Sequence, residues 1–129
     1  MNGKLLLDTN IIIALFAKDQ QIHQLLLNSE EVFVPCIAMG ELYFGAYSSL
    51  RVKENIERIN EFSINNAVLG CNLDIAQTYG KIKNSLREKG QPIPENDIWI
   101  AAIAQQYDLI LLSRDAHFRL IEDLRFERI

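Results

Sequence analysis

Four acidic residues lie at positions from which their side chains could act together on one ligand. Asp8 directly follows a short apolar run, and Asp115 comes three residues after the end of another. Asp97 stands near the start of a predicted helix, and Glu41 lies inside a second predicted helix. If the apolar runs are parallel strands, their carboxyl ends meet at one edge of the sheet, where ligands bind. We therefore expect the four carboxylates to converge on one site.

Glu41 is the hardest of the four to explain as an ordinary structural residue. Ile37 and Phe44 flank it on an apolar side of the predicted helix 36–48. No Lys or Arg lies three or four residues away to neutralise its charge. Burying an unpaired carboxylate is unfavourable, so this position indicates that a cation binds nearby.

The other three acids each have an ordinary structural interpretation as well. Asp8 could cap the helix that follows it, and Asp97 could be a first-turn acid favoured by the helix dipole. Asp115 could be a turn or cap residue. The combination of all four nevertheless favours a shared chemical role.

Carboxylates gathered at one edge repel one another and raise one another's pKa unless a positive charge lies between them. Carboxylate oxygens are hard ligands, and the sequence places no His or Cys among them, which favours Mg²⁺ or Mn²⁺ over zinc. Such ions activate a water molecule and stabilise charge on the attacking and leaving oxygens. The acids therefore point to metal-dependent phosphoryl chemistry.

Short apolar runs alternating with helical patterns must position these residues. Strands are predicted at 4–7, 32–34, 67–69 and 109–112 with an edge strand within 124–129, and helices at 11–26 with a break near Asp19, 36–48, 53–62, 75–89 and about 96–105. Wholly apolar strands between helices are typical of a parallel sheet covered on both faces. We expect one α/β domain over residues 1–129, a three-layer α/β/α sandwich around a mainly parallel sheet of four to five strands.

The composition fits a globular chain and excludes several classes. The chain has 129 residues, 49 % of them apolar, and a net charge of −4. These values exclude a disordered or collagen-like chain, and the acidic balance argues against a surface built for non-specific nucleic-acid binding. The sequence shows no signal peptide, no membrane-spanning stretch and no CxxC pattern at Cys36 or Cys71. We expect two buried reduced thiols and a cytoplasmic location.

At four places the sequence resembles PIN-domain nucleases, in particular the VapC-type toxins of bacterial toxin–antitoxin pairs. The similar segments are 5–12 (LLLDTNII), 40–46 (GELYFGA), 96–104 (NDIWIAAIA) and 111–118 (LLSRDAHF). They occur in the family's order and span essentially the whole chain. One departure is Cys36, which follows Pro35 where relatives commonly carry Ser or Thr, and which weakens the expected N-cap of the Glu41 helix.

The resemblance implies helices around a parallel sheet and the hydrolysis of RNA phosphodiester bonds. It implies that Mg²⁺ or Mn²⁺ is bound and water activated by Asp8, Glu41, Asp97 and Asp115, with Asn10 and Ser113 as polar neighbours of the metal site. It further implies an RNA substrate, a cognate antitoxin whose tail lies across the site, and a homodimer.

Other functions are compatible with an acidic α/β chain of this length. A receiver-like Mg²⁺-binding signalling domain needs two adjacent acids after the first strand and a Lys after the last core strand, whereas Asp8 stands alone and Ser113-Arg114-Asp115 contains no Lys. An Asp-x-Asp phosphatase needs an acid where Asn10 stands. A PIN-fold protein that binds or processes RNA without being a toxin stays open.

Beyond the acids, Arg114 is the best candidate for a contact with a substrate phosphate, because it lies inside the fourth similar segment. His117, two residues after Asp115, is expected to be a solvated surface residue. Asp74 and Gln77 have the spacing of a capping box. The run 11–16 is apolar enough to contact a partner as well as the core.

Overall fold

The computed structural model describes residues 3–129, and in this range it has five strands, six α-helices and one short 3₁₀ helix. In chain order the elements are β1 (Lys4–Leu7), α1 (Thr9–Phe16), α2 (Gln20–Leu27), β2 (Glu31–Pro35), α3 (Cys36–Tyr47), α4 (Val52–Ile64), β3 (Ala67–Leu69), α5 (Leu73–Glu88), α6 (Glu95–Gln106), β4 (Ile110–Ser113), η1 (Ala116–Leu120) and β5 (Phe126–Arg128).

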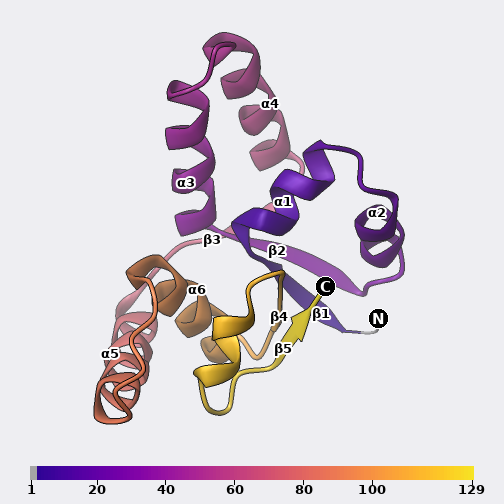
Figure 1. The fold of residues 1–129 in the computed structure, drawn as a ribbon. Helices are drawn as coiled ribbons and strands as arrows, with labels where there is room; N and C mark the ends of the chain where they lie inside the picture. Colours follow the sequence, from indigo (N-terminus) through magenta and orange to yellow (C-terminus); the bar gives the residue numbers. More distant parts are fainter. Residues whose placement is uncertain (1–2) are drawn as a thin grey trace.

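The five strands form one parallel sheet in the order β3-β2-β1-β4-β5 (Figure 1). β1 is the central strand, and its register pairs Leu7 with Leu112 of β4. The backbone N–H of Asp8 continues this ladder by donating to the carbonyl of Leu112 at 3.0 Å. The pairing of the two strands therefore places Asp8 beside Ser113.

Alternate residues of the central strand enter two different cores. Leu5 and Leu7 belong to the core beneath α1, α2, α3 and α4, whereas Leu6 belongs to the core beneath α5 and α6. Successive side chains of a strand point to opposite faces, so a strand covered on both sides must be apolar throughout. The helices occupy both faces of the sheet (Figure 1). The predicted three-layer α/β/α sandwich with a parallel sheet is confirmed.

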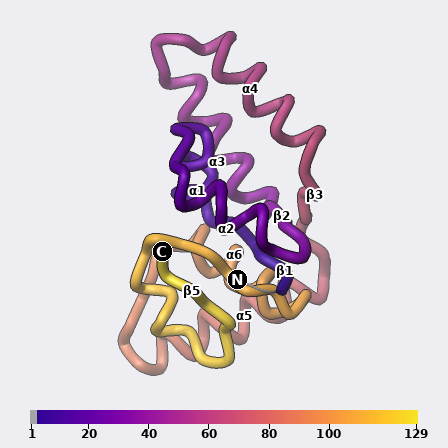
Figure 2. Tube along the Cα trace, turned by 90° about the vertical axis from the view of Figure 1, so that its right-hand side faces the viewer, coloured from indigo at the N-terminus to yellow at the C-terminus, as the bar shows by residue number. Residues whose placement is uncertain are grey.

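Helices α3 and α4 pack as a hairpin that projects from the sheet (Figure 2). The expectation that Phe44 lies on a buried side of α3 is wrong, because its side chain is 75 % exposed. The buried side of α3 is formed instead by Ala38, Met39, Leu42 and Ala46. Apolar residues occur on every side of this helix, so helical periodicity alone does not identify the side that faces the core.

Two local predictions at helix ends need correction. The N-cap of α5 is Asn72, whose side chain accepts from the backbone N–H of Ile75 at 3.0 Å, and Asp74 lies in the first turn instead. Helix α6 starts at Glu95 after Pro94, one or two residues before the predicted start at Asn96 or Asp97. Helix α3 has no side-chain cap at all, as the Pro35-Cys36 sequence predicts.

The two thiols lie near each other but are not buried in a core. Cys36 is half-buried and Cys71 is exposed, so the expectation of two buried thiols is wrong. They follow two paired strands, because Pro35 of β2 is the register partner of Leu69 of β3. Over residues 3–129, no helix combines the length and the apolar character needed to cross a bilayer.

Candidate functional site

A cleft of about 550 Å³ opens at the carboxyl ends of the central strands. Its walls come from the residues that follow β1, from the middle of α3, from the start of α6 and from the loop after β4. The lining residues are Asp8, Thr9, Asn10, Ile13, Glu41, Pro94, Glu95, Asn96, Asp97 and Asp115. All four predicted acids line this one cleft, as the convergence of parallel strand ends requires.

Asp8 is the most buried of the four acids, with 5 % of its surface exposed. Its side chain caps α1 by accepting from the backbone N–H of Thr9 at 2.9 Å, so the structural interpretation of this residue is correct as well. Burial raises the pKa of Asp8 above its usual value of 3.8, against the lowering effect of the hydrogen bond from Ser113. Further raising effects come from the charges of Asp97 and Asp115.

Asn10 and Ser113 both contact Asp8. The hydroxyl of Ser113 donates to Oδ2 of Asp8 at 2.6 Å, and the side-chain amide of Asn10 donates to the same oxygen at 3.4 Å and to Ser113 Oγ at 3.3 Å. Ser113 also accepts from the backbone N–H of Asp115 at 3.0 Å. Asn10 and Ser113, the two predicted polar neighbours, thus orient Asp8 directly, and Ser113 also connects it to the loop that carries Asp115.

Glu41 reaches the cleft from α3. Partial burial is the main cause that raises the pKa of Glu41 above its usual 4.5, and the charges of Asp8 and Asp97 raise it further. In the part of the chain that the structure describes, no ion pair joins Glu41 to a Lys or Arg. The described residues therefore leave the charge of Glu41 without a basic partner, which is the reason the sequence analysis gave for expecting a cation nearby.

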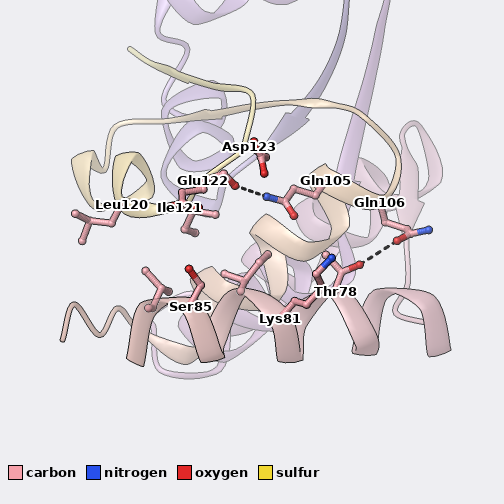
Figure 3. Close-up of a pocket in the computed structure, with 11 residues that line it drawn as sticks. Thr78, Lys81, Ser85, Gln105, Gln106, Leu120, Ile121, Glu122 and Asp123 are labelled. Atoms are coloured by element: carbon pink, nitrogen blue, oxygen red, sulfur yellow. Dashed lines mark hydrogen bonds between the residues drawn. The ribbon is translucent and has the colours of Figure 1, made fainter. Parts of the chain in front are cut away.

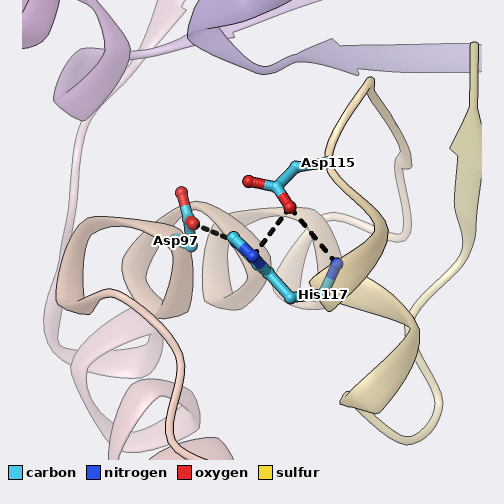
Figure 4. Close-up of side chains that lie close together, drawn as sticks. All are labelled: Asp97, Asp115 and His117. Atoms are coloured by element: carbon cyan, nitrogen blue, oxygen red, sulfur yellow. Dashed lines mark hydrogen bonds and ion pairs between the residues drawn. The ribbon is translucent and has the colours of Figure 1, made fainter.

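Asp97 and Asp115 are joined by a residue that the sequence analysis placed on the surface. His117 lies with its ring between the two acids, and Nε2 is 2.5 Å from Asp97 Oδ2 while Nδ1 is 2.7 Å from Asp115 Oδ1 (Figure 4). Only 28 % of the His117 side chain is exposed. The expectation of a solvated histidine, and with it the premise that no His lies among the acids, is wrong.

The position of His117 follows from a short helix. Asp115 is the N-cap of η1 and accepts from the backbone N–H of His117 at 3.3 Å. This turn brings the imidazole back toward the acid two residues earlier in the chain. Burial raises the pKa of Asp97, and His117 opposes that rise through a hydrogen bond and its charge. The one sequence feature that could have indicated this position of His117 is its place two residues after Asp115, a residue type that caps helices.

Arg114 lies beside the cleft but is not among the residues that line it. Its guanidinium donates to Asp19 Oδ2 at 2.8 Å, and this contact is the main cause that lowers the pKa of Asp19. The Arg114 backbone N–H donates to Asn10 Oδ1 at 3.2 Å. The predicted contact of Arg114 with a substrate phosphate stays a prediction.

A second cavity of about 280 Å³ lies between α5, α6 and the segment 120–123 (Figure 3). Gln105 donates to the carbonyl of Glu122 at 2.7 Å, and Thr78 donates to Gln106 at 3.1 Å. Four of the lining residues are thus joined in two pairs, and the cavity contains none of the four predicted acids. The acidic cleft is the better candidate for chemistry.

Residues 5–124 match the sequence model of the family described as "PIN domain". This chain belongs to the PIN-domain family. The match spans β1 to the segment before β5, so it includes all four acids of the cleft.

Relatives of this PIN domain share its length as well as its fold. It is 34 % identical over 128 residues to Ribonuclease VapC1 of Haemophilus influenzae strain R2866, covering 95 % of each chain. It is 29 % identical over 127 residues to the tRNA(fMet)-specific endonuclease VapC of Salmonella typhimurium, covering 96 % of each chain. Among solved structures, that of VapBC-1 from nontypeable Haemophilus influenzae matches with a TM-score of 0.87 and 31 % identity, covering 98 % of each chain. The resemblance to VapC proteins is confirmed.

Proposed function

We propose that this PIN domain is a metal-dependent endoribonuclease and the toxin of a toxin–antitoxin pair. The observation that carries the proposal is the gathering of Asp8, Glu41, Asp97 and Asp115 in one cleft. The names of the similar proteins, a ribonuclease and a tRNA-specific endonuclease, support RNA as the substrate. The similarity to VapBC-1 supports a cognate antitoxin as the partner.

The residues of the cleft suit a divalent cation. Three carboxyl groups, those of Asp8, Glu41 and Asp97, have raised pKa values, first because they are partly or wholly buried and then because other acids lie near them. The hydroxyl of Thr9, which lines the same cleft, is buried close enough to Glu41 to lower the pKa of that carboxyl, but makes no hydrogen bond of ordinary geometry within residues 3–129. Oxygen donors of this kind prefer Mg²⁺ or Mn²⁺. We propose that the four acids hold such an ion.

A bound ion of this class supplies an activated water and stabilises negative charge on the phosphate oxygens. The chain's own residues prepare the cleft for it. Ser113 and Asn10 fix the carboxylate of Asp8, and the N-cap contact with Thr9 restricts its rotation further. Such fixed orientation lowers the reorganisation needed in the reaction.

The direct test is cleavage of RNA by the purified protein. A panel of structured RNAs that includes initiator tRNA is incubated with Mg²⁺ or Mn²⁺, and we expect endonucleolytic products that disappear with EDTA. Asp8→Asn removes one acid of the cleft and should abolish cleavage, whereas Asp74→Asn, on the exposed start of α5, should leave it intact. Cleavage that persists with EDTA and in Asp8→Asn would contradict the proposal.

The toxin role has a separate test, because a PIN-fold protein that processes RNA for the host would also cleave. Expression of the chain alone should arrest growth, and expression of Asp8→Asn should not. Normal growth with verified folded protein would favour the processing function instead. The receiver-like alternative is not supported, since the order β3-β2-β1-β4-β5 differs from the 2-1-3-4-5 order of that fold. The homodimer and the cytoplasmic location stay predictions.

A further inference from the structure

The two cysteines of the chain lie at the carboxyl ends of neighbouring strands. Strands β2 and β3 pair in parallel, with Pro35 opposite Leu69. Cys36 directly follows Pro35 as the first residue of α3, and Cys71 stands two residues after Leu69, just before the N-cap of α5. Adjacent strands are about 4.8 Å apart. The register therefore brings two thiols that are distant in the sequence to one corner of the sheet.

The side chains of the two cysteines are close as well. Burial is the main cause that raises the pKa of the Cys71 thiol, and the neighbouring Cys36 raises it further, an effect that requires the two side chains to lie near each other. Residues one position out of register on adjacent strands have Cα atoms about 6 Å apart, inside the span of about 4.4–6.8 Å that a disulfide needs. A bond between the two sulfurs therefore requires little movement of the backbone.

No other role accounts for the two thiols within residues 3–129. Neither belongs to the hydrophobic cores on the two faces of the sheet, and Cys36 provides no side-chain cap for α3. The group of possible metal ligands found in that range contains no cysteine. Cys71 is exposed, so a small oxidant reaches it from solvent, whereas Cys36 is half-buried. An accessible thiol beside a second thiol suits disulfide exchange that is completed within one chain.

We propose that Cys36 and Cys71 form a reversible intrachain disulfide, with a small-molecule disulfide as the oxidant. The thiolate of Cys71 attacks one sulfur of the small disulfide and displaces the other as a thiolate, which takes up a proton. The thiolate of Cys36 then attacks the Cys71 sulfur of this mixed disulfide and displaces the second small thiolate. The protein loses two S–H bonds and gains one S–S bond, and two electrons and two protons leave with the two small thiols.

The bond closes residues 37–70 into one covalent loop, which contains α3, α4 and β3. Helix α3 starts at Cys36, at the end of β2, and carries Glu41 into the acidic cleft (Figure 1). Oxidation therefore anchors the base of the helix that supplies one acid. A cross-link that fits the native fold restricts mainly the unfolded chain and so raises the melting temperature. In a reducing compartment the pair stays as two thiols.

The test is oxidation of the tag-free protein by oxidised glutathione in EDTA, at about pH 8.5, where a larger share of the thiols is ionised than at neutral pH. We expect the intact mass to fall by two hydrogen atoms with no glutathione attached. A peptide map without reducing agent should show Cys36 linked to Cys71. The melting temperature should rise by about 5–15 °C and return to its starting value with dithiothreitol.

Two variants separate proximity from simple reactivity. Cys36→Ser removes the second thiol, so oxidation should stop at a glutathione adduct on Cys71. The matched control, Cys71→Ser combined with Asn84→Cys, keeps two cysteines but moves the exposed one along α5, about 18 Å from the start of the helix. It should form adducts and no intrachain bond, because a disulfide does not span that distance. Circular dichroism of the reduced variants checks their folding, and the wild-type result decides even if one misfolds.

The proposal is overturned by a wild type that stops at a glutathione adduct or forms only disulfide-linked dimers, because Cys36 then does not reach its neighbour. It is also overturned by an intrachain bond that fails to raise the melting temperature, or that forms equally in the control, because the bond then does not fit the native fold. None of these readouts involves RNA or a metal ion. Failure of the proposed function therefore leaves this inference standing, and the reverse holds as well.

Discussion

Ser113 donates its hydroxyl to Asp8 across 105 residues of chain, at a distance of 2.6 Å, and thereby joins the ends of two central strands. The same oxygen of Ser113 accepts from the backbone N–H of Asp115. One small side chain therefore links two acids of the cleft, and its effect on both can be measured.

We expect Ser113→Ala to weaken both the fold and the cleft. The loss of a buried hydrogen bond costs about 1 kcal/mol of unfolding free energy, measured by urea denaturation in EDTA. The pKa of Asp8 rises further without its donor, and loss of such an orienting contact lowers metal affinity by about 10–100-fold. Ser85→Ala, on α5 and outside the acidic cleft, is the control. Unchanged Mn²⁺ affinity in Ser113→Ala would mean that Asp8 needs no help from this hydroxyl.

Asp8→Asn should stabilise the metal-free protein at neutral pH while it removes activity. The pKa of Asp8 is raised in the folded state, so folding favours its protonated form. The corresponding contribution to stability is fully present below the unfolded pKa of 3.8 and is lost as the pH rises through the folded value. The side-chain amide of the Asp8→Asn variant does not ionise, so the variant does not lose this stability as the pH rises. In EDTA the melting temperature of Asp8→Asn should exceed that of the wild type at pH 7, and the difference should shrink toward pH 4. A lower melting temperature at pH 7 would contradict the raised pKa.

Metal binding should release protons and strengthen with pH. The raised pKa values of Asp8, Glu41 and Asp97 mean that protons and a cation compete for the same oxygens. Calorimetric titrations with Mn²⁺ in buffers of different ionisation enthalpy count the released protons. We expect the count to fall and the affinity to level off above the folded pKa values. Affinity that does not vary with pH would show that the acids are already ionised without metal.

Arg114→Ala separates a structural ion pair from a substrate contact. The pair with Asp19 is partly exposed, with 44 % and 31 % of the two side chains accessible, so solvent screens it and its loss should change stability little. A phosphate contact predicts instead a higher KM for RNA and a salt dependence reduced by about one charge. Asp19→Asn keeps an N-cap for α2 and frees the guanidinium, so it should not raise KM. Equal KM for wild type and Arg114→Ala would remove Arg114 from the substrate site.

The sheet and the acids could be predicted because both depend on patterns that are local in the sequence. A parallel strand buried on both faces is a continuous apolar run, as at Leu5, Leu6 and Leu7, and the ends of such strands converge wherever their acids lie. Asp8 and Asp115 followed from that rule. Ser113 was expected beside the site from the family resemblance alone, and the pairing of Leu7 with Leu112 explains its contact with Asp8.

The predictions that were wrong depend on contacts between residues far apart in the sequence, or on a choice between residues of similar chemistry. His117 meets Asp97 across 20 residues of chain, through a turn of η1 that no spacing rule identifies. Asn72 and Asp74 are both residue types that cap helices well, and they stand only two positions apart. The sequence therefore does not identify which of them is the N-cap of α5. The buried side of α3 depends on where α4 and the sheet lie, since Phe44 is as apolar as the residues that are buried.

The register of β1 against β4 has a consequence for local opening of the molecule. Asp8 and Ser113 stand at the ends of the middle strand and its neighbour, whose leucines are fully buried on both faces. Segments of this kind exchange their amide hydrogens only through global unfolding. The half of the cleft that they form therefore belongs to the last cooperative unit to open, and it stays assembled for as long as any of the sheet does.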